Sequence, residues 1–213
     1  MIPIPERGIY LASRSPRRRE LLSQIGVRYH LLLFRERPRG SSSDQQEIDE
    51  APLAGEAPAA YVERMARAKA DAGWSRMLQR NLPPAPVLAA DTTVAFKEQI
   101  LGKPRDRAEA AEMLAALSGQ RHEVLTGVAL KNYDQVEFAL SSSEVVLKKL
   151  SADEIALYAA SGEGDDKAGA YAIQGRAGRF VVELRGSYSG VMGLPLYETA
   201  QVLDKLRERR NPY

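Results

Sequence analysis

Near the start of the chain, residues 9–22 read Ile9-Tyr10-Leu11-Ala12-Ser13-Arg14-Ser15-Pro16-Arg17-Arg18-Arg19-Glu20-Leu21-Leu22. A short apolar run ends in a loop that carries two hydroxyl groups, and apolar residues then recur at helical spacing. Ser15 is a favourable helix N-cap, and Pro16 suits the first helical position. This stretch predicts a strand, a tight loop and a helix, which is the beginning of an α/β pattern.

Strand and helix patterns alternate along the rest of the chain. The apolar run Val87 to Ala90 predicts a buried strand with Asp91 at its carboxyl end, where open α/β sheets place their ligands. Residues 123–130 and 136–147 predict an antiparallel hairpin. Further strands are expected at 29–34, 92–96 and 180–184, and helices at 58–77, 106–117, 152–160 and from Pro195 onward. No domain boundary is evident, so we expect a single α/β domain over residues 1–213.

The composition excludes several classes of protein. The 213 residues include 30 Lys and Arg against 28 Asp and Glu, and a net charge of +2 does not suit a uniformly basic nucleic-acid-coating protein. Without cysteine the chain forms no disulfide, iron–sulfur cluster or cysteine zinc site. No apolar stretch approaches the ~18 residues of a membrane span. We therefore expect a cytoplasmic protein without a membrane or nucleic-acid partner.

Positive charge is concentrated at the N-terminal end. Residues 1–40 contain nine Arg and three Glu, a balance of +6, which leaves −4 for the remainder. Arg17, Arg18 and Arg19 follow a predicted strand and open a predicted helix, where unpaired N–H groups and the helix dipole favour an anion. Guanidinium groups placed there suit a phosphate chain. The alternative is an ordinary solvated helix face.

Several carboxylates are candidates for a metal site. Asp91 follows a buried strand, and Asp49 and Glu50 follow a polar loop at 35–47 that we expect to be mobile. Mg²⁺ takes one or two carboxylates together with water and phosphate oxygens. The plainer alternatives are a turn aspartate for Asp91 and a surface acidic pair for the other two. Lys103, on a stiff turn, either faces a phosphate or is simply exposed.

Other familiar catalytic motifs are incomplete. Lys167 lacks the paired glycine and hydroxyl of a P-loop, and Tyr188 stands where α/β-hydrolases have a nucleophilic serine. His30 and His122 are 92 positions apart, which gives no histidine zinc site, and we expect His122 to be structural, at a strand edge. The glycine-rich segment 162–178 is too polar and broken for the core and is expected to be a functional loop.

Blocks of residues along nearly the whole chain match a known family in the right order. The likeness begins with the twelve residues from Leu11 to Leu22. It continues through Ile48-Asp49-Glu50, Arg64-Met65-Ala66-Arg67-Ala68-Lys69-Ala70, Ala90-Asp91-Thr92, Leu101-Gly102-Lys103-Pro104, Leu117-Ser118-Gly119 with His122, Asp166-Lys167-Ala168-Gly169, Ile173-Gln174-Gly175 and Gly193-Leu194-Pro195-Leu196-Tyr197-Glu198-Thr199. On these blocks the chain resembles the Maf family, once called septum-formation inhibitors and now regarded as nucleoside triphosphate pyrophosphatases.

This resemblance implies both a fold and a reaction. The fold would be a mixed, elongated sheet flanked by helices, similar to that of the inosine triphosphate pyrophosphatases, with two lobes around a cleft and usually a homodimer. The reaction would cleave a nucleoside triphosphate between its α and β phosphates, giving the monophosphate and pyrophosphate. A divalent metal cation, Mg²⁺ or Mn²⁺, would serve as cofactor.

The resemblance also implies roles for individual residues. Asp91 matches the family's proton acceptor, and Glu50 matches an acidic position that would share the metal with it. Positions linked to substrate choice are matched by Arg17, Thr92 and Gln174. Positions where phosphate contacts are expected are matched by Ser13, Arg18, Lys69 and Lys103.

The substrate branch is indicated by two short motifs. Asp91-Thr92 and Ile173-Gln174-Gly175 resemble the dTTP and UTP branch, whereas the 7-methyl-GTP branch typically has Asp-Gln at the first of these. The alternatives are a 7-methyl-GTP or modified-nucleotide pyrophosphatase, or a non-enzymatic division-regulating protein that binds through its basic N-terminal segment. Two departures from the family bear on substrate entry: the 35–47 loop is longer than usual, and Arg14 adds a charge.

Overall fold

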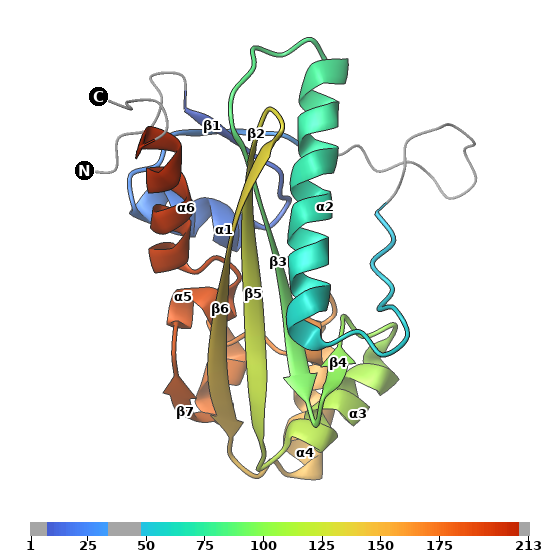
Figure 1. Ribbon diagram of the computed structural model, residues 1–213. Helices are drawn as coiled ribbons and strands as arrows, with labels where there is room; N and C mark the ends of the chain where they lie inside the picture. The colour runs from blue at the N-terminus through green and yellow to red at the C-terminus, as the bar shows by residue number, and fades with distance from the viewer. Residues whose placement is uncertain (1–7, 34–47, 209–213) are drawn as a thin grey trace.

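The computed structural model describes residues 8–33 and 48–208, with side chains to Leu206 (Figure 1). The strands are β1 (Ile9–Leu11), β2 (Tyr29–Leu31), β3 (Val87–Phe96), β4 (Gln99–Leu101), β5 (Arg121–Asn132), β6 (Gln135–Leu147) and β7 (Val181–Arg185). The helices are α1 (Pro16–Gln24), α2 (Pro58–Gln79), α3 (Arg107–Leu117), α4 (Ala152–Ser161), α5 (Tyr188–Met192) and α6 (Leu196–Glu208). Two 3₁₀ turns, Ala168–Ala170 and Arg176–Phe180, follow α4.

Over these described residues the strands form one mixed sheet in the order β2-β1-β3-β5-β6-β7, with β4 beside β3. β1 pairs in parallel with β2 and β3, and the other pairs are antiparallel. β3, β5 and β6 are the long central strands (Figure 1). Tyr133 and Asp134 close the β5–β6 hairpin, and Tyr133 has the positive φ of 56° that tight hairpin turns require. The predicted hairpin and mixed sheet are confirmed.

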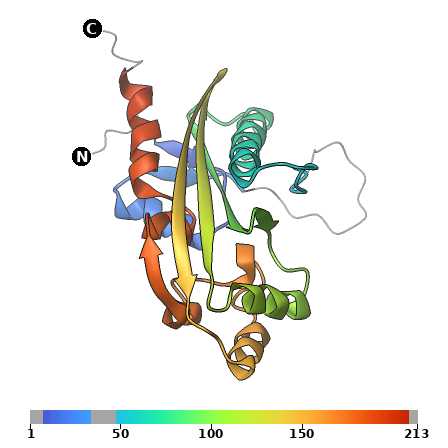
Figure 2. The ribbon, with the colours of Figure 1, turned by 60° about the horizontal axis from the view of Figure 1, so that its bottom comes forward.

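Helices cover both faces of the sheet. Leu88 and Ala90 of β3 pack with Leu22 of α1 and with apolar residues of α6. The alternate residues Val87 and Ala89 pack with α2. Because successive strand residues point to opposite faces, this run is buried on both sides. Figure 2 shows α2 and α6 on opposite sides of the sheet.

The backbone of α2 lies close to the sheet because of one glycine. A Cβ atom at Gly73 would lie 2.8 Å from Val87 Cγ1 and 2.9 Å from the Ala12 Cβ. A larger residue there would push the helix away from β1 and β3. This close packing matters for function because α2 carries Lys69 and β3 carries Asp91.

A second core lies toward the other end of the long strands, beneath α3 and α4 (Figure 1). Its buried side chains include Leu114 and Tyr158, but also Tyr171, Ile173 and Ala177 from the glycine-rich segment. The prediction that this segment stays out of the core is therefore wrong. Its average polarity concealed a run of five consecutive buried residues at 169–173.

Two further predictions about secondary structure are corrected. Asp91 does not end a strand, because Thr92 to Phe96 continue β3 and pair with β5 and β4. The short helix α5 was not expected, since its five residues carry no amphipathic pattern. The single-domain organisation and the cleft between two lobes stay predictions, and the 35–47 loop lies outside the described residues. In the part of the chain that the structure covers, no helix has the length and apolar character to cross a membrane.

His122 is a core residue of an interior strand, so the prediction of a strand-edge position is wrong. Its ring is 3% exposed, stands edge-on to the Tyr171 ring, and has Nε2 2.7 Å from the Tyr171 hydroxyl. Burial lowers the pKa of His122 from 6.5 to about 4. The imidazole is consequently neutral in the folded protein at neutral pH.

Acid should destabilise the fold through His122. Between pH 6.5 and 4 the unfolded chain binds more protons at this residue than the folded chain, so stability falls as the pH is lowered through this window. The loss should be on the order of 3 kcal/mol. Urea unfolding from pH 4 to 7 would measure it, and His122→Gln should flatten the pH dependence while the exposed His30→Gln should not. Equal slopes for the wild type and His122→Gln would contradict this assignment.

Candidate active site

Two carboxylates converge on one lysine where α2 packs against β3. Lys69 Nζ donates a hydrogen bond to Asp91 Oδ1 at 2.6 Å and lies 2.7 Å from Glu50 Oε1. Asp91 is buried, in the middle of β3 opposite Gly127 of β5. The three charged groups come from separate parts of the sequence, so this cluster exists only in the folded chain.

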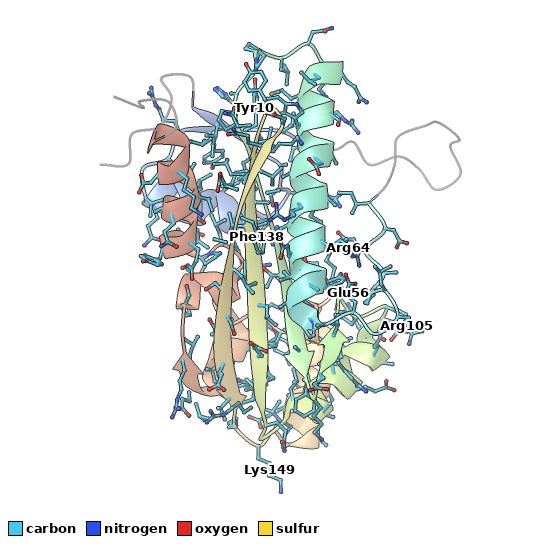
Figure 3. The ribbon with its side chains drawn as sticks, in the orientation of Figure 1. Tyr10, Glu56, Arg64, Arg105, Phe138 and Lys149 are labelled. Atoms are coloured by element: carbon cyan, nitrogen blue, oxygen red, sulfur yellow. The ribbon has the colours of Figure 1, made fainter. Side chains whose placement is uncertain are left out.

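The segment that carries Glu50 is fastened to the start of α2. Tyr61 donates its hydroxyl hydrogen to the Glu50 carbonyl at 2.9 Å, and Arg64 donates to the Ala51 carbonyl at 3.1 Å. Arg64 also holds both Glu56 oxygens at 2.6 Å, a contact that lowers the pKa of Glu56 to about 2. Figure 3 shows Glu56 and Arg64 facing one another beside α2. These bonds fix the chain path that brings Glu50 to Lys69.

Lys103 extends the cluster on its exposed side. Its Nζ lies 3.6 Å from Glu50 Oε2, and more than half of its side chain is exposed. Burial raises the pKa of Glu50, but the hydrogen bond and charge of Lys69, followed by those of Lys103, outweigh burial and lower it overall. Glu50 is therefore a carboxylate at neutral pH, between two ammonium groups.

Arg18 is braced by a chain of hydroxyl and carbonyl groups. Its Nε donates to the Gly193 carbonyl at 2.7 Å, and Nη2 donates to Thr92 Oγ1 at 3.3 Å. Thr126 Oγ1 donates its hydrogen to the Gly190 carbonyl at 2.8 Å. Thr92 must then donate to Thr126, 3.0 Å away, and can only accept from Arg18. The two bonds that Arg18 donates fix the plane of its guanidinium, and its Nη1 group takes part in neither of them.

Arg18 also faces the carboxylates. Burial lowers the pKa of Arg18, and the negative charge of Asp91 is the largest effect that opposes this. An arginine retains its positive charge despite such a shift. Asp91 and Thr92 are successive residues of β3 and point to opposite faces of the sheet, so the link between Arg18 and the aspartate is electrostatic.

Arg17 lies beside Gln174 of the glycine-rich segment. With the Gln174 amide oxygen turned toward Arg17, it accepts from Nε at 3.1 Å and from Nη1 at 3.0 Å. The amide NH₂ group then points away from Arg17 and has its hydrogens available. Burial lowers the pKa of Arg17, as for Arg18, and the guanidinium stays charged.

The structure brings the predicted site residues into one neighbourhood. Glu50, Lys69, Lys103 and Asp91 form one cluster, and the charges of Asp91 and Glu50 act on Arg18, which bonds to Thr92. The neighbour of Arg18, Arg17, leads on to Gln174. Ser13 lies at the edge of this neighbourhood. Its side chain accepts from the Ser15 backbone N–H at 3.2 Å, and Ser15 caps α1 as predicted.

Sequence reasoning assigned no role to a further cation, Lys167. Its side chain is 14% exposed and contacts Asp166, and the positive charges of Arg17 and Lys103 act on it. Burial, together with these two cations, lowers its pKa to about 8. The Gly169 N–H donates to the Gly102 carbonyl at 3.1 Å, which fixes this segment beside the Lys103 turn. The Asp166-Lys167-Ala168-Gly169 block was the available signal, because it belongs to the family resemblance, but no role was derived for its lysine.

The donor set suits a hard divalent cation. Within residues 8–33 and 48–208, three or more His, Asp or Glu side chains do not gather into a metal cluster. Two carboxylate oxygens, one from Glu50 and one from Asp91, nevertheless both contact the Lys69 ammonium. Mg²⁺ and Mn²⁺ prefer such oxygen ligands, and Mg²⁺ needs only one or two carboxylates when phosphate oxygens and water supply the rest.

Comparison with known families and proteins gives concordant matches. The family model described as "Maf-like protein" matches residues 8–206. A "dTTP/UTP pyrophosphatase" of Dechloromonas aromatica is 56% identical, over 93% of this chain and 96% of its own length. Proteins with the same name from Nitrosomonas europaea and Aromatoleum aromaticum are 54% and 55% identical, over 92% and 96% of this chain and 93% and 97% of their own lengths.

A solved structure also matches part of the fold. The Staphylococcus aureus Ham1 protein aligns with a TM-score of 0.40 and 14% sequence identity, over 65% of this chain and 71% of the Ham1 chain.

Proposed function

Because this chain belongs to the Maf family, we propose that it is an enzyme that hydrolyses dTTP and UTP to the nucleoside monophosphate and pyrophosphate. The observation that carries the proposal is the contact of Lys69 with the buried Asp91, whose negative charge also acts on Arg18. Cations that can hold a polyphosphate thus lie next to a carboxylate that can act on water. The names of relatives that share more than half of their residues with this chain support the same substrates.

Binding of the triphosphate would fall to the cations. A triphosphate carries about four negative charges near neutral pH, so positioning and charge neutralisation dominate phosphoryl-group hydrolysis. Arg18 offers a guanidinium whose orientation is already fixed by Gly193 and Thr92. Lys103 adds an exposed ammonium, and Lys69 one that two carboxylates already hold in place. Ser13, at the N-terminal loop, would contact the phosphates through its hydroxyl.

Asp91 would orient the attacking water and accept its proton. Water attacks the α phosphorus, the bond from that phosphorus to the bridging oxygen breaks, and pyrophosphate leaves. A carboxylate alone is a weak base, so it needs help from nearby charge. We assign Glu50 and Asp91 to hold a divalent cation, which when bound supplies charge neutralisation and a lower pKa for water. Lys69, which contacts both carboxylates, would keep them close to one another.

Gln174 would read the base through its free NH₂ group. Arg17 occupies the amide oxygen, so the group that Gln174 can offer to a ligand is a hydrogen-bond donor. Thymine and uracil present a carbonyl at position 4, which accepts, whereas cytosine presents an amine there, which cannot. Thr92 contributes indirectly, because its hydroxyl is engaged with Arg18 and Thr126.

Gln174→Glu should weaken base reading. The carboxylate has no hydrogen to donate and would pair with Arg17, so kcat/KM for dTTP should fall about tenfold, the cost of one lost hydrogen bond. The ratio of kcat/KM for dTTP to that for dCTP is the measurement, and Gln201→Glu on α6 makes the same chemical change away from Arg17. If the ratio stays unchanged, Gln174 does not read the base.

A panel of triphosphates tests the proposed function itself. Purified protein with Mg²⁺ should release pyrophosphate from dTTP and UTP faster than from dCTP, dGTP or 7-methyl-GTP. Preferred hydrolysis of 7-methyl-GTP would replace the substrate assignment. Absence of turnover together with a steeply salt-dependent affinity for duplex DNA would favour a binding protein.

The remaining features of the proposal come from the sequence. We propose that the chain is a single domain over residues 1–213, acts in the cytoplasm and forms a homodimer. Sedimentation velocity at micromolar concentration would test the last of these, since a monomer would sediment distinctly more slowly.

A further inference from the structure

One pair of side chains holds the backbone on both sides of Gln174. The Tyr158 hydroxyl accepts from the Ala172 backbone N–H at 3.0 Å and donates to Glu163 Oε1 at 3.1 Å. The same Glu163 oxygen accepts from the Arg176 backbone N–H at 2.8 Å. Ala172 and Arg176 lie two positions before and two positions after Gln174. The three bonds therefore form a clamp, Tyr158–Glu163, that spans this residue.

The direction of each bond in the clamp is determined. Burial raises the pKa of Tyr158, so its hydroxyl is protonated and has one hydrogen to donate. Backbone N–H groups can only donate, so the Tyr158 oxygen receives Ala172 and its hydrogen goes to Glu163. The Glu163 carboxylate accepts two hydrogen bonds on one oxygen, which makes both of them charge-assisted.

The chain between the clamped N–H groups is a tight turn that leaves Gln174 outside. The Gly175 N–H donates to the Ala172 carbonyl at 3.0 Å, which closes the turn, and Gln174 at its corner is exposed. A Cβ atom at residue 175 would lie 2.1 Å from Glu163 Oε1, so only glycine lets the carboxylate approach the turn this closely. The turn is thus shaped to receive Glu163.

The clamp itself rests on a rigid support. Tyr158 is buried in α4, with its ring edge-on to Phe180 at a centroid distance of 5.6 Å. Glu163 follows Gly162, which ends α4 in the left-handed conformation with φ 72°. One residue of the clamp lies on α4 and the other directly follows the cap of α4. The Gln174 turn is therefore held relative to the core and not merely to its neighbours in sequence.

We propose that Tyr158 and Glu163 are positioning residues that set base selectivity by fixing the Gln174 turn in front of Arg17. This inference rests on the proposed function. The clamp holds the backbone on either side of Gln174, so its effect passes through the position of the Gln174 amide. Loss of the clamp should therefore reduce discrimination between bases more than it reduces phosphate chemistry.

Three variants test the clamp by steady-state kinetics with dTTP and dCTP. Glu163→Ala leaves the Arg176 N–H and the Tyr158 hydroxyl without their acceptor and should lower the dTTP to dCTP ratio of kcat/KM about tenfold, with kcat for dCTP nearly unchanged. Glu163→Gln keeps an oxygen at the same place and should restore most of the ratio. Tyr158→Phe removes one oxygen atom, keeps the buried ring and should give an intermediate loss, which retains the test if Glu163→Ala fails to fold.

A double-mutant cycle separates positioning from general destabilisation. In a Gln174→Ala background, Glu163→Ala should produce no further loss of the ratio, because the amide that the clamp positions is already gone. The proposal would be overturned if the losses of the ratio in the two single variants multiplied in the double variant. It would also be overturned if kcat/KM fell equally for both nucleotides. If the wild type releases no pyrophosphate from any triphosphate, the proposed function has failed. The clamp is then judged by the same comparison in equilibrium binding of dTTP and dCTP, where unchanged selectivity in Glu163→Ala would overturn it.

Discussion

Asp91→Asn is expected to lower kcat for dTTP at least ~100-fold while KM changes little. Asparagine has the size of aspartate and can still accept from Lys69, so the fold and the cation cluster should be retained. It cannot accept a proton or offer a full negative charge. The effect should therefore fall on the chemical step, and kcat measured by pyrophosphate release is the readout.

Asp71→Asn is a matched control for this change. Asp71 lies two residues after Lys69 on α2 and pairs with Lys131 at 2.5 Å, and its neutralisation should leave kcat unchanged. Thermal unfolding of both variants would show that each is folded. Wild-type turnover in Asp91→Asn would remove the aspartate from the chemistry and leave the convergence of Lys69 and Arg18 unexplained.

Arg18→Lys should be the second large effect, with kcat/KM for dTTP reduced by roughly 100-fold. The guanidinium uses two N–H groups on Gly193 and Thr92 and keeps others for phosphate. An ammonium is not a planar group with parallel donors. It cannot bond to Gly193 and Thr92 and at the same time present two parallel donors to a phosphate. Charge is conserved in this substitution, so the loss would measure geometry.

The neighbouring substitution Arg19→Lys provides the comparison, since it makes the same chemical change one position later in α1. It should alter kcat/KM less than threefold. Similar losses at both positions would mean that the N-terminal cations act as a general positive field, screened by salt, and that the bracing of Arg18 has no special importance.

Features set by local chemistry could be predicted from the sequence. Ser15 and Pro16 mark the start of α1, and Ser151 with Glu154 forms a capping box at the start of α4, where a helix was predicted. The β5–β6 hairpin follows from β-forming runs on either side of a short polar turn. In each case the decisive interactions span only a few residues, so their pattern is visible in a single sequence.

Features set by tertiary contacts could not be predicted from the sequence. The polar run at Asp91 to Thr93 suggests a strand end, but pairing with β5 continues the strand through it. Lys69 was expected to contact phosphate, whereas the ion pairs with Glu50 and Asp91 depend on how closely α2 packs on β3. The Tyr158–Glu163 clamp bonds to backbone N–H groups of a distant turn. Almost every residue type has such a group, so the sequence pattern does not indicate these bonds.

The bond from Arg18 to Gly193 has a consequence for biosynthesis. It joins residues 175 positions apart, one at the first helix and one just before the last. On the ribosome, the arginine emerges early, but its Gly193 acceptor is made only after all seven strands that the structure describes. A polypeptide whose translation stops before residue 193 would carry both carboxylates and the whole sheet, yet Arg18 would lack its bond to Gly193 and keep only the bond to Thr92. We expect such an incomplete copy to hold a triphosphate less firmly than the full chain.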